Sequence, residues 1–568
     1  MEFKFGGSEL NQRTILGHPS GLFMLFFTEM WERFSYYGMR ALLVLFLTTS
    51  LLGDELKGYA PGWGWDRVDA IGLYGIYTGL VYLTPLFGGM IADKLLGYRK
   101  AVLIGAFIMA LGHGFMAIES SHLFFYAGLT CLILGNGLFK PNISSIVGQL
   151  YKDESKKDSA YTIFYMGINA GAFLGILLCG YIGEKISWSY GFGLAGIFML
   201  LGMLQFYFGQ SILGKIGLQP KDAVEEEGED VNKEVIKESK DSSNKRMITW
   251  AIVGVVIAVV LFFLLPNSDT NSVLTQINRK WIPPLVFGLV IPFVGYIVTN
   301  PTLTKVEKDR VWVIIILTFF TIFFWWAFEQ AGGSMTVFAA DYTDRTLEGS
   351  SGVIFNVVNA ILTVGSLGVI TWVLIKLFNV TFTELKVSNL ILGFSFIVIW
   401  GIVIWMLQRE FASDKTEVGA SWFSILNSFF IITMAPLVSK FWEKGVIKSG
   451  PIKFALGLLI LGIGFGILSF GASSIPDGAK TASVSMIWLI LAYYFHTMGE
   501  LCVSPVGLSY VSKLSPVRLI GLMFGIWFIA NFVANWAGGL TGSYIDTCLL
   551  YTSPSPRDQR GSRMPSSA

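Results

Sequence analysis

Long apolar stretches, separated by short polar loops, run through almost the entire chain. A helix needs about 20 mostly apolar residues to cross the hydrocarbon core of a bilayer, and lipid leaves helices and closed barrels as the only spanning structures. The sequence therefore predicts an all-α protein that crosses a membrane many times. The fifteen predicted spans are 21–50, 68–93, 100–119, 122–149, 160–183, 187–210, 248–265, 281–299, 311–338, 351–378, 388–408, 419–441, 452–472, 484–511 and 518–545.

The composition excludes the common soluble classes. Charged residues make up 14% of the 568 residues and hydrophobic residues 53%, whereas roughly a quarter of an ordinary soluble domain is charged. A formal net charge of +2 gives no basic surface for nucleic acid. The four cysteines stand apart, without a CxxC pair, so we expect neither a disulfide framework nor a metal site.

Two segments interrupt the apolar pattern. In the segment 211–247 more than half of the residues from Pro220 onwards are charged, which is typical of a solvated linker on the cytoplasmic side. The segment 546–568 is rich in Pro, Ser and Arg and continues no apolar period, so it is expected to be either a disordered tail or a non-native extension.

Basic residues in short loops predict the orientation of the chain, because cytoplasmic loops carry an excess of Lys and Arg. Alternate loops are basic, whereas the loop 51–66 has one Lys against three acidic residues. This asymmetry predicts a cytoplasmic N-terminus. The basic residues of the alternate loops include Lys94, Arg99, Lys100, Lys152, Lys156, Lys157, Lys440, Lys444, Lys448 and Lys453.

Six ionisable residues inside predicted spans are candidates for function, because charged groups there are costly and mark functional sites. Three of them share the first span at spacings that place them on one helix face. We expect the six to line one wet cavity, although buried charges can also serve only to fix helix packing. No GxxxxGK[ST] motif for ATP is present, which favours a secondary transporter driven by protons. The six residues are Glu29, Glu32, Arg33, Lys140, Glu329 and Glu500.

Several of these residues lie in segments that resemble sequence motifs of a known protein family. The segment 29–38, EMWERFSYYG, resembles the ExxERFxYYG motif of the proton-dependent oligopeptide transporters of the major facilitator superfamily. The segment 499–509, GELCVSPVGLS, is similar to the tenth helix of that family, and 324–330, FWWAFEQ, to its seventh. The segment 137–142, GLFKPN, is similar to its fourth helix.

The resemblance implies two helical bundles, which would occupy 1–210 and 300–545. The segment 211–247 would join them, and 248–299 would be the pair of extra helices found between the bundles in bacterial members. The segment 421–427, SWFSILN, looks like the family's eighth helix. This alignment makes 351–408 two additional spans.

The same alignment assigns 518–545 to the eleventh core helix. No apolar stretch is then left for a twelfth, so the final core helix is expected to be missing. The tail 546–568 would then resemble translated adapter sequence fused to a truncated gene.

The function implied by the resemblance is proton-coupled uptake of di- and tripeptides across the bacterial cytoplasmic membrane by alternating access, without enzymatic activity or a cofactor. A related carrier of nitrate or another small anion is the alternative. By resemblance, proton coupling would involve Glu29, Glu32, Arg33 and Glu329. The substrate-binding residues would be Arg33, Tyr36, Tyr37, Tyr82, Lys140, Asn169, Trp325, Asn427, Glu500, Ser504 and Trp527.

Two further expectations concern single positions. His496 lies in an apolar span and is interpreted as a hydrogen-bonded packing residue, with a proton relay as the alternative. Gly167, Gly171 and Gly175 recur every fourth residue, which favours close packing of their helix against a neighbour.

Overall fold

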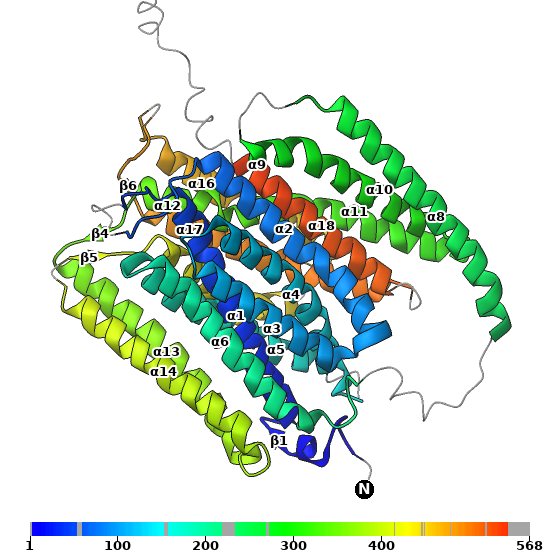
Figure 1. The fold of residues 1–568 in the computed structure, drawn as a ribbon, viewed down its shortest axis with the longest axis horizontal. Helices are drawn as coiled ribbons and strands as arrows, with labels where there is room; N and C mark the ends of the chain where they lie inside the picture. The colour runs from blue at the N-terminus through cyan, green and yellow to red at the C-terminus, as the bar shows by residue number, and fades with distance from the viewer. Residues whose placement is uncertain are drawn as a thin grey trace, which may run out of the picture.

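A computed structural model describes residues 3–53, 59–152, 157–218, 233–267, 272–413, 415–444, 447, 449–476, 479–516 and 520–542. The tail 546–568 and part of the predicted linker, 219–232, lie outside these residues. Helices make up nearly all of the described fold (Figure 1).

Each of the fifteen predicted spans contains a long helix. By length and composition, thirteen of the described helices could cross a membrane. The other two, α1 and α17, are equally long and carry the buried charges described below. The prediction of an all-α membrane protein is confirmed. The first six helices are α1 (Ser20–Thr48), α2 (Arg67–Ile91), α3 (Tyr98–Met116), α4 (His122–Gln149), α5 (Lys157–Lys185) and α6 (Trp188–Gly209).

In the described part of the chain, eleven further α-helices follow, some of them short. They are α8 (Lys233–Leu264), α9 (Val273–Gln276), α10 (Ile282–Val298), α11 (Lys305–Phe328), α12 (Ser334–Asp341), α13 (Ser350–Thr381), α14 (Lys386–Phe411), α15 (Ile425–Glu443), α16 (Gly450–Ala472), α17 (Ile487–Leu514) and α18 (Ile520–Gly542).

Among the described residues, six two-residue strands form three small ladders outside the long helices. The strands β1 (Thr14–Ile15) and β2 (His18–Pro19) pair antiparallel before α1. The strands β3 (Thr343–Asp344) and β6 (Val484–Ser485) pair parallel. The strands β4 (Thr346–Leu347) and β5 (Thr416–Glu417) pair antiparallel and close the base of the α13–α14 hairpin.

One helix is longer than its predicted span, and another predicted span needs correction. The helix α8 begins at Lys233, inside the segment predicted as a linker, because the Lys and Glu residues there are good helix formers continuous with the apolar stretch. The predicted span 311–338 is broken rather than continuous. A short 3₁₀ turn, η6 (Glu329–Gly332), separates α11 from α12, where the consecutive Gly332 and Gly333 disfavour an α-helix.

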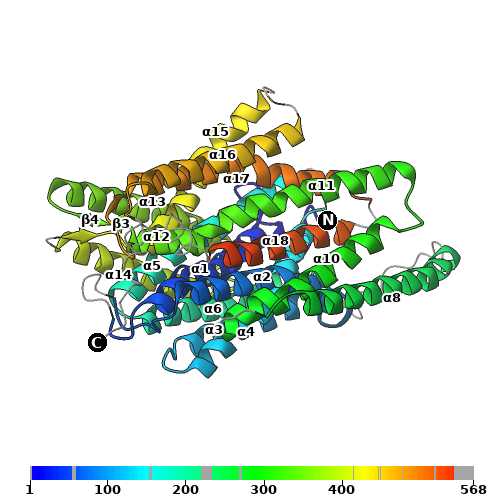
Figure 2. The same ribbon diagram turned by 90° about the horizontal axis from the view of Figure 1, so that it is seen from above.

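The long helices pack as two groups. In the first helix group, α1–α6, α1 packs on α5 and α6, and α3 packs on α4. The second helix group comprises α11, α12 and α15–α18, in which α17 packs on α15 and α16. The two groups meet along α2 and α18, which lie side by side in both ribbon views (Figures 1 and 2).

The α13–α14 hairpin follows the second group's α12 in sequence but packs on the first group. In Figure 1 it lies along α6. Ser388 Oγ donates to the Gln205 carbonyl oxygen at 2.8 Å, and Arg13 pairs with Glu384 at 2.7 Å. These contacts fix the hairpin to parts of the chain that are distant in sequence.

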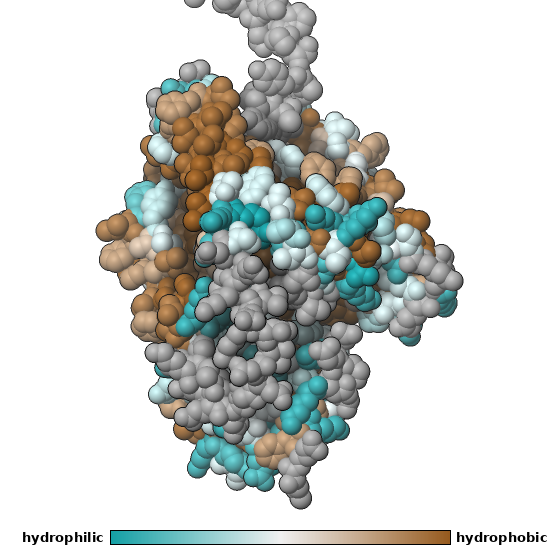
Figure 3. All heavy atoms as spheres, turned by 90° about the vertical axis from the view of Figure 1, so that its right-hand side faces the viewer, coloured by the Kyte–Doolittle hydropathy of each residue, from teal (hydrophilic) through white to brown (hydrophobic). Residues whose placement is uncertain are grey.

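The helices α8 and α10 form a second hairpin, which stands at the edge of the molecule in Figure 1. Over residues 251–264 of α8 the exposed side chains are apolar, and Ile252, Val256 and Phe263 are among them. Seen from that side, hydrophobic side chains cover much of the upper and left-hand surface, while hydrophilic ones lie across the middle, on the right and at the lower end (Figure 3). An exposed apolar surface of this kind is suited to contact with lipid.

The glycines of α5 allow α1 to approach it closely, as the four-residue spacing predicts. A Cβ atom at Gly167 would lie 3.0 Å from the carbonyl oxygen of Phe26. Cβ atoms at Gly171 and Gly175 would overlap the α1 backbone outright. These contacts hold the charged face of α1 against α5.

We expect Gly171→Ala to destabilise the protein by about 1–3 kcal/mol, because the added methyl group meets the rigid carbonyl of Met30. The thermal midpoint of the purified protein in detergent measures this effect. Gly114→Ala is the matched control, since a Cβ atom at that position would meet no heavy atom within 4 Å beyond its own stretch of helix. Equal midpoints for the two variants would contradict the assigned α1–α5 contact.

Candidate functional site

A cavity of about 330 Å³ lies between the two helix groups. The helices α1, α2, α4 and α5 form one wall, and α11, α15, α17 and α18 form the other. Eleven of the fourteen predicted site residues line it: Arg33, Tyr37, Tyr82, Lys140, Asn169, Trp325, Glu329, Asn427, Glu500, Ser504 and Trp527. The remaining three, Glu29, Glu32 and Tyr36, lie behind this lining.

The acidic pair of α1 is buried around Arg33. Arg33 Nη2 donates to Glu32 Oε1 at 2.7 Å, and Arg33 Nε lies 3.3 Å from Glu29 Oε1. Asn136 Nδ2 also donates to Glu32 Oε1, at 2.9 Å. Glu29 Oε2 has no hydrogen-bond partner among the described residues. Two carboxylates therefore share one guanidinium, an arrangement that can take up a proton without breaking the Arg33 pair.

The cations of the first wall lie against tyrosine rings. The Arg33 guanidinium carbon is 5.1 Å from the ring centre of Tyr36 and 6.0 Å from that of Tyr37. Lys140 Nζ is 5.1 Å from the ring centre of Tyr82. Such cation–π contacts orient the charged groups. Tyr36 is buried behind Tyr37, and its role as a substrate contact stays a prediction.

The opposite wall carries an acid. Glu500 lies in the middle of α17, five residues before Pro505, and is only 7% exposed. Asn427 Nδ2 donates to Glu500 Oε2 at 2.8 Å and to Thr497 Oγ1 at 3.1 Å. The amide thus fixes the orientation of the carboxylate. The cavity has cations on one wall and an oriented carboxylate on the other.

Arg40 is a functional candidate that the sequence analysis missed. It pairs with Glu329 at the break between α11 and α12, and it also donates to the hydroxyl of Tyr74. This ion pair crosses between the two helix groups. The sequence does carry a signal for it, because Arg40 is a charged residue within the apolar span 21–50, two turns after Arg33 on the same face.

The same periodicity identifies further lining residues on α17. Tyr493, His496, Glu500 and Ser504 follow one another at spacings of three and four, which places them on one face. The expectation that His496 is hydrogen-bonded is wrong for the described residues, since both ring nitrogens lack a partner there. Its ring instead packs on Phe465, with the ring centres 4.5 Å apart.

The site offers nothing for a metal ion within the part of the chain that the structure describes. No group of three or more His, Cys, Asp or Glu side chains is arranged there to hold one. The chemistry that the arrangement supports is recognition of opposite charges and exchange of protons.

Comparison with known families gives one match that covers most of the chain. The model of the POT family matches residues 99–404 and 393–549.

Three curated bacterial relatives are similar over most of their length. The di-/tripeptide transporter of Lactococcus lactis subsp. cremoris is 31% identical, over 92% of this chain and 88% of that protein. The peptide transporter YePEPT of Yersinia enterocolitica is 30% identical, over 94% and 89%. The uncharacterized transporter YclF of Bacillus subtilis is 32% identical, over 92% and 87%.

Solved structures give the same picture. A crystal structure of a variant of peptide transporter POT in complex with alafosfalin has a TM-score of 0.68 and 29% identity, and covers 95% of this chain and 92% of that one. A POT family transporter in complex with 5-aminolevulinic acid has a TM-score of 0.68 and 26% identity, over 95% and 94%.

Proposed function

This chain belongs to the POT family, and on that premise we propose that it takes up di- and tripeptides together with protons by alternating access. The relatives whose names state a substrate are peptide transporters. The family is one of transporters, and we propose that this chain likewise has no enzymatic activity and needs no cofactor beyond the proton gradient.

The observation that carries this proposal is the polarity of the cavity. A short peptide is a zwitterion with one carboxylate and one ammonium group. Arg33 and Lys140 on one wall suit the carboxylate, because a guanidinium fork offers bidentate geometry and Lys a point charge. Glu500 on the other wall, oriented by Asn427, suits the ammonium. The distance between the walls would then limit the length of the peptide.

The remaining lining residues are proposed to contact the rest of the peptide. Tyr37, Tyr82, Trp325 and Trp527 offer aromatic surface to its side chains. Trp325 and Ser504 also line the cavity, and Trp325 Nε1 and Ser504 Oγ have no hydrogen-bond partner among the described residues, so we propose that each can turn to bond the peptide. Asn169 also lines the cavity and offers an amide to the peptide backbone.

Proton coupling is proposed to use two acidic sites. The first is the Glu29–Glu32–Arg33 cluster next to the substrate carboxylate site. The second is Glu329, whose ion pair with Arg40 joins the two helix groups. A proton on Glu329 would remove its charge and release Arg40, so protonation and movement of the groups would be linked.

The family and the loop charges support a proposal for the placement in the cell. We propose that the chain lies in the bacterial cytoplasmic membrane with its N-terminus in the cytoplasm. We also propose that the first helix group corresponds to the bundle 1–210 and the second, with the additional hairpin 351–408, to the bundle 300–545. The oligomeric state is left open.

Exchange of labelled dialanine tests the proposed function. Proteoliposomes loaded with unlabelled dialanine are expected to accumulate the labelled peptide, because exchange needs no net movement of protons. The nitrate alternative receives no support from the relatives named above, and excess nitrate should not compete. Exchange of nitrate, with none of dialanine, would overturn the proposal.

A further inference from the structure

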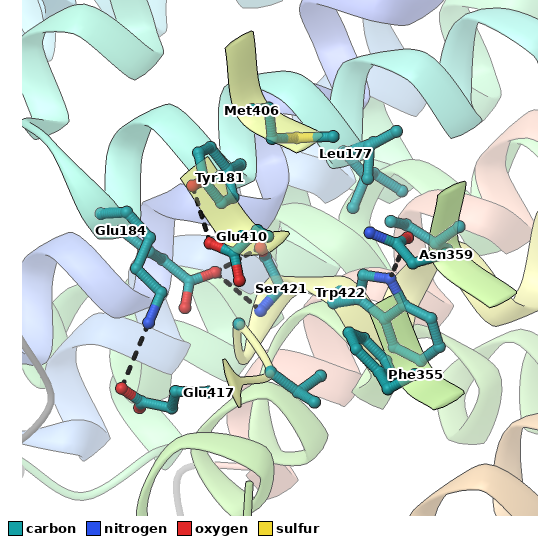
Figure 4. A pocket seen from close by; sticks show the side chains of 15 residues that line it. Leu177, Tyr181, Glu184, Phe355, Asn359, Met406, Glu410, Glu417, Ser421 and Trp422 are labelled. Atoms are coloured by element: carbon teal, nitrogen blue, oxygen red, sulfur yellow. Dashed lines mark hydrogen bonds and ion pairs between the residues drawn. The ribbon is translucent and has the colours of Figure 1, made fainter. Parts of the chain in front are cut away.

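Glu184 lies at the end of α5 and is only 1% exposed, yet its carboxylate does not belong to the central cavity. Its partners come from two parts of the chain. Tyr59 Oη donates to Glu184 Oε2 at 2.8 Å from the segment before α2. The backbone N–H groups of Ala420 and Ser421 donate to it at 2.8 and 2.9 Å, as does the hydroxyl of Ser421 (Figure 4).

Ala420 and Ser421, which donate hydrogen bonds to this carboxylate, lie at the start of a helix of the second group. A 3₁₀ turn, η7 (Ser421–Ser424), runs directly into α15, so that one membrane-length helix extends over Ser421–Trp442. The first N–H groups of a helix have no partner within the helix, and its N-terminus favours negative charge. Glu184 therefore caps this helix, although it stands on α5 of the first helix group.

The contact is close as well as polar. A Cβ atom at Gly180 would overlap the Ser421 hydroxyl, and one at Gly419 would lie 3.1 Å from Glu184 Oε1. The two glycines thus let α5 and the start of the 421–442 helix touch directly. The carboxylate reaches the two amides without a bridging water.

Other contacts between the groups gather at the same end of the molecule. Arg67, at the start of α2, pairs with Asp341 at 2.7 Å and donates to the Tyr342 hydroxyl at 2.8 Å. Lys185, the residue after Glu184, pairs with Glu417 at 3.2 Å. This end, defined by Tyr59, Arg67, Asp341, Glu184 and Ser421, is called the latch end below.

The capped helix also reaches the proposed substrate site. Asn427, which orients Glu500, lies six residues after Ser421 on the same continuous helix. Ser424, Ser428 and Ile431 of this helix line the cavity as well. A carboxylate that fixes the start of the helix therefore fixes one wall of the cavity relative to α5, which supplies part of the opposite wall.

We propose that Glu184 is a positioning residue for transport: by capping the 421–442 helix from the opposite group, it holds the latch end closed. The inference rests on the proposed function, because alternating access requires this end to open. On opening, water replaces the carboxylate at the two amides. Glu184 keeps its bond to Tyr59, which comes from its own helix group, so the carboxylate is not left without a partner.

Hydrogen–deuterium exchange of the full chain in lipid nanodiscs tests this proposal. In Glu184→Ala, the peptides that cover Ala420 and Ser421 are expected to exchange about tenfold faster, equivalent to ~1.4 kcal/mol. Peptides around Arg67 and Asp341 should also exchange faster, because the whole latch end opens. Faster exchange confined to 420–421 would reduce Glu184 to a local cap and overturn the proposal.

Three further variants guard against simple misfolding. Ser421→Ala removes one bond between the groups and no buried charge, so it should give a smaller change in the same peptides. Glu184→Gln keeps an acceptor oxygen and should lie between Glu184→Ala and the unmodified protein. Thr433→Ala is the matched control, since its hydroxyl donates within α15 to the Phe429 carbonyl oxygen, and its loss should leave the latch end unchanged.

The hydrogen–deuterium exchange measurement does not depend on transport of dialanine. If the unmodified protein fails to transport dialanine, the proposed function is overturned, but the effect of Glu184→Ala on hydrogen–deuterium exchange can still be measured. Alternatively, the unmodified protein transports dialanine and Glu184→Ala leaves hydrogen–deuterium exchange unchanged throughout the latch end. That result would overturn the role of Glu184 and leave the proposed function standing. Faster exchange in all helices, with a lower thermal midpoint, would indicate a purely structural role and would also overturn it.

Discussion

Glu32→Gln is expected to abolish dialanine uptake driven by a pH gradient while sparing exchange of labelled for unlabelled dialanine. A Gln keeps the shape of Glu32 and can still accept the bond from Asn136, but it cannot take up or release a proton. Gradient-driven uptake requires net proton movement, whereas exchange does not. Uptake into proteoliposomes with an imposed pH gradient, measured beside exchange without one, separates the two steps.

The matched control for this experiment is Glu9→Gln, which changes an exposed acid before α1 and should transport normally. Glu29→Gln is expected to resemble Glu32→Gln, because both carboxylates share Arg33. Normal gradient-driven uptake in both Glu29→Gln and Glu32→Gln would show that these two acids take no part in proton coupling.

Glu500→Gln is expected to weaken the binding of free dipeptides strongly and the binding of N-acetylated dipeptides little. Removing one partner of a buried charge pair typically costs about 2–5 kcal/mol, because the other charge is left unpaired. Every ~1.4 kcal/mol corresponds to a tenfold loss of affinity. In the unmodified protein, acetylated dipeptides should therefore compete at least roughly tenfold more weakly than free ones, and this difference should shrink in the variant.

Competition for labelled dialanine exchange gives both affinities in one assay. Glu348→Gln serves as the control, since that acid is exposed and does not line the cavity. An equal loss of affinity for free and acetylated peptides in Glu500→Gln would show that Glu500 does not recognise the ammonium group. Its contribution would then be structural or would concern proton transfer.

The sequence by itself predicted the type and the places of the long helices that the structure describes. Lipid cannot satisfy backbone hydrogen bonds, so each stretch of about 20 apolar residues must form a helix. The cost of burying charge likewise pointed to Glu29, Lys140 and Glu500 before any contact was known. Helical spacing placed the acids of α1 on one face with Arg33, and the structure shows them in contact.

Only the tertiary structure decided which distant groups meet. The local pair Gly332 and Gly333 explains the helix break at Glu329. The ion-pair partner of Glu329, Arg40, lies 289 positions away along the chain. The α13–α14 hairpin lies between α12 and α15 of the second group in sequence and packs on the first group through Ser388 and Gln205.

Glu184 shows why such contacts escape prediction from sequence. Along the chain it is an acid at the end of an apolar helix, where exposure to water is the ordinary outcome. It is buried because the tertiary fold brings the amides of Ala420 and Ser421 against it. Local patterns determine the helices since backbone hydrogen bonds and hydrophobicity act along the chain, whereas the pairing of charges depends on how the helices pack in space.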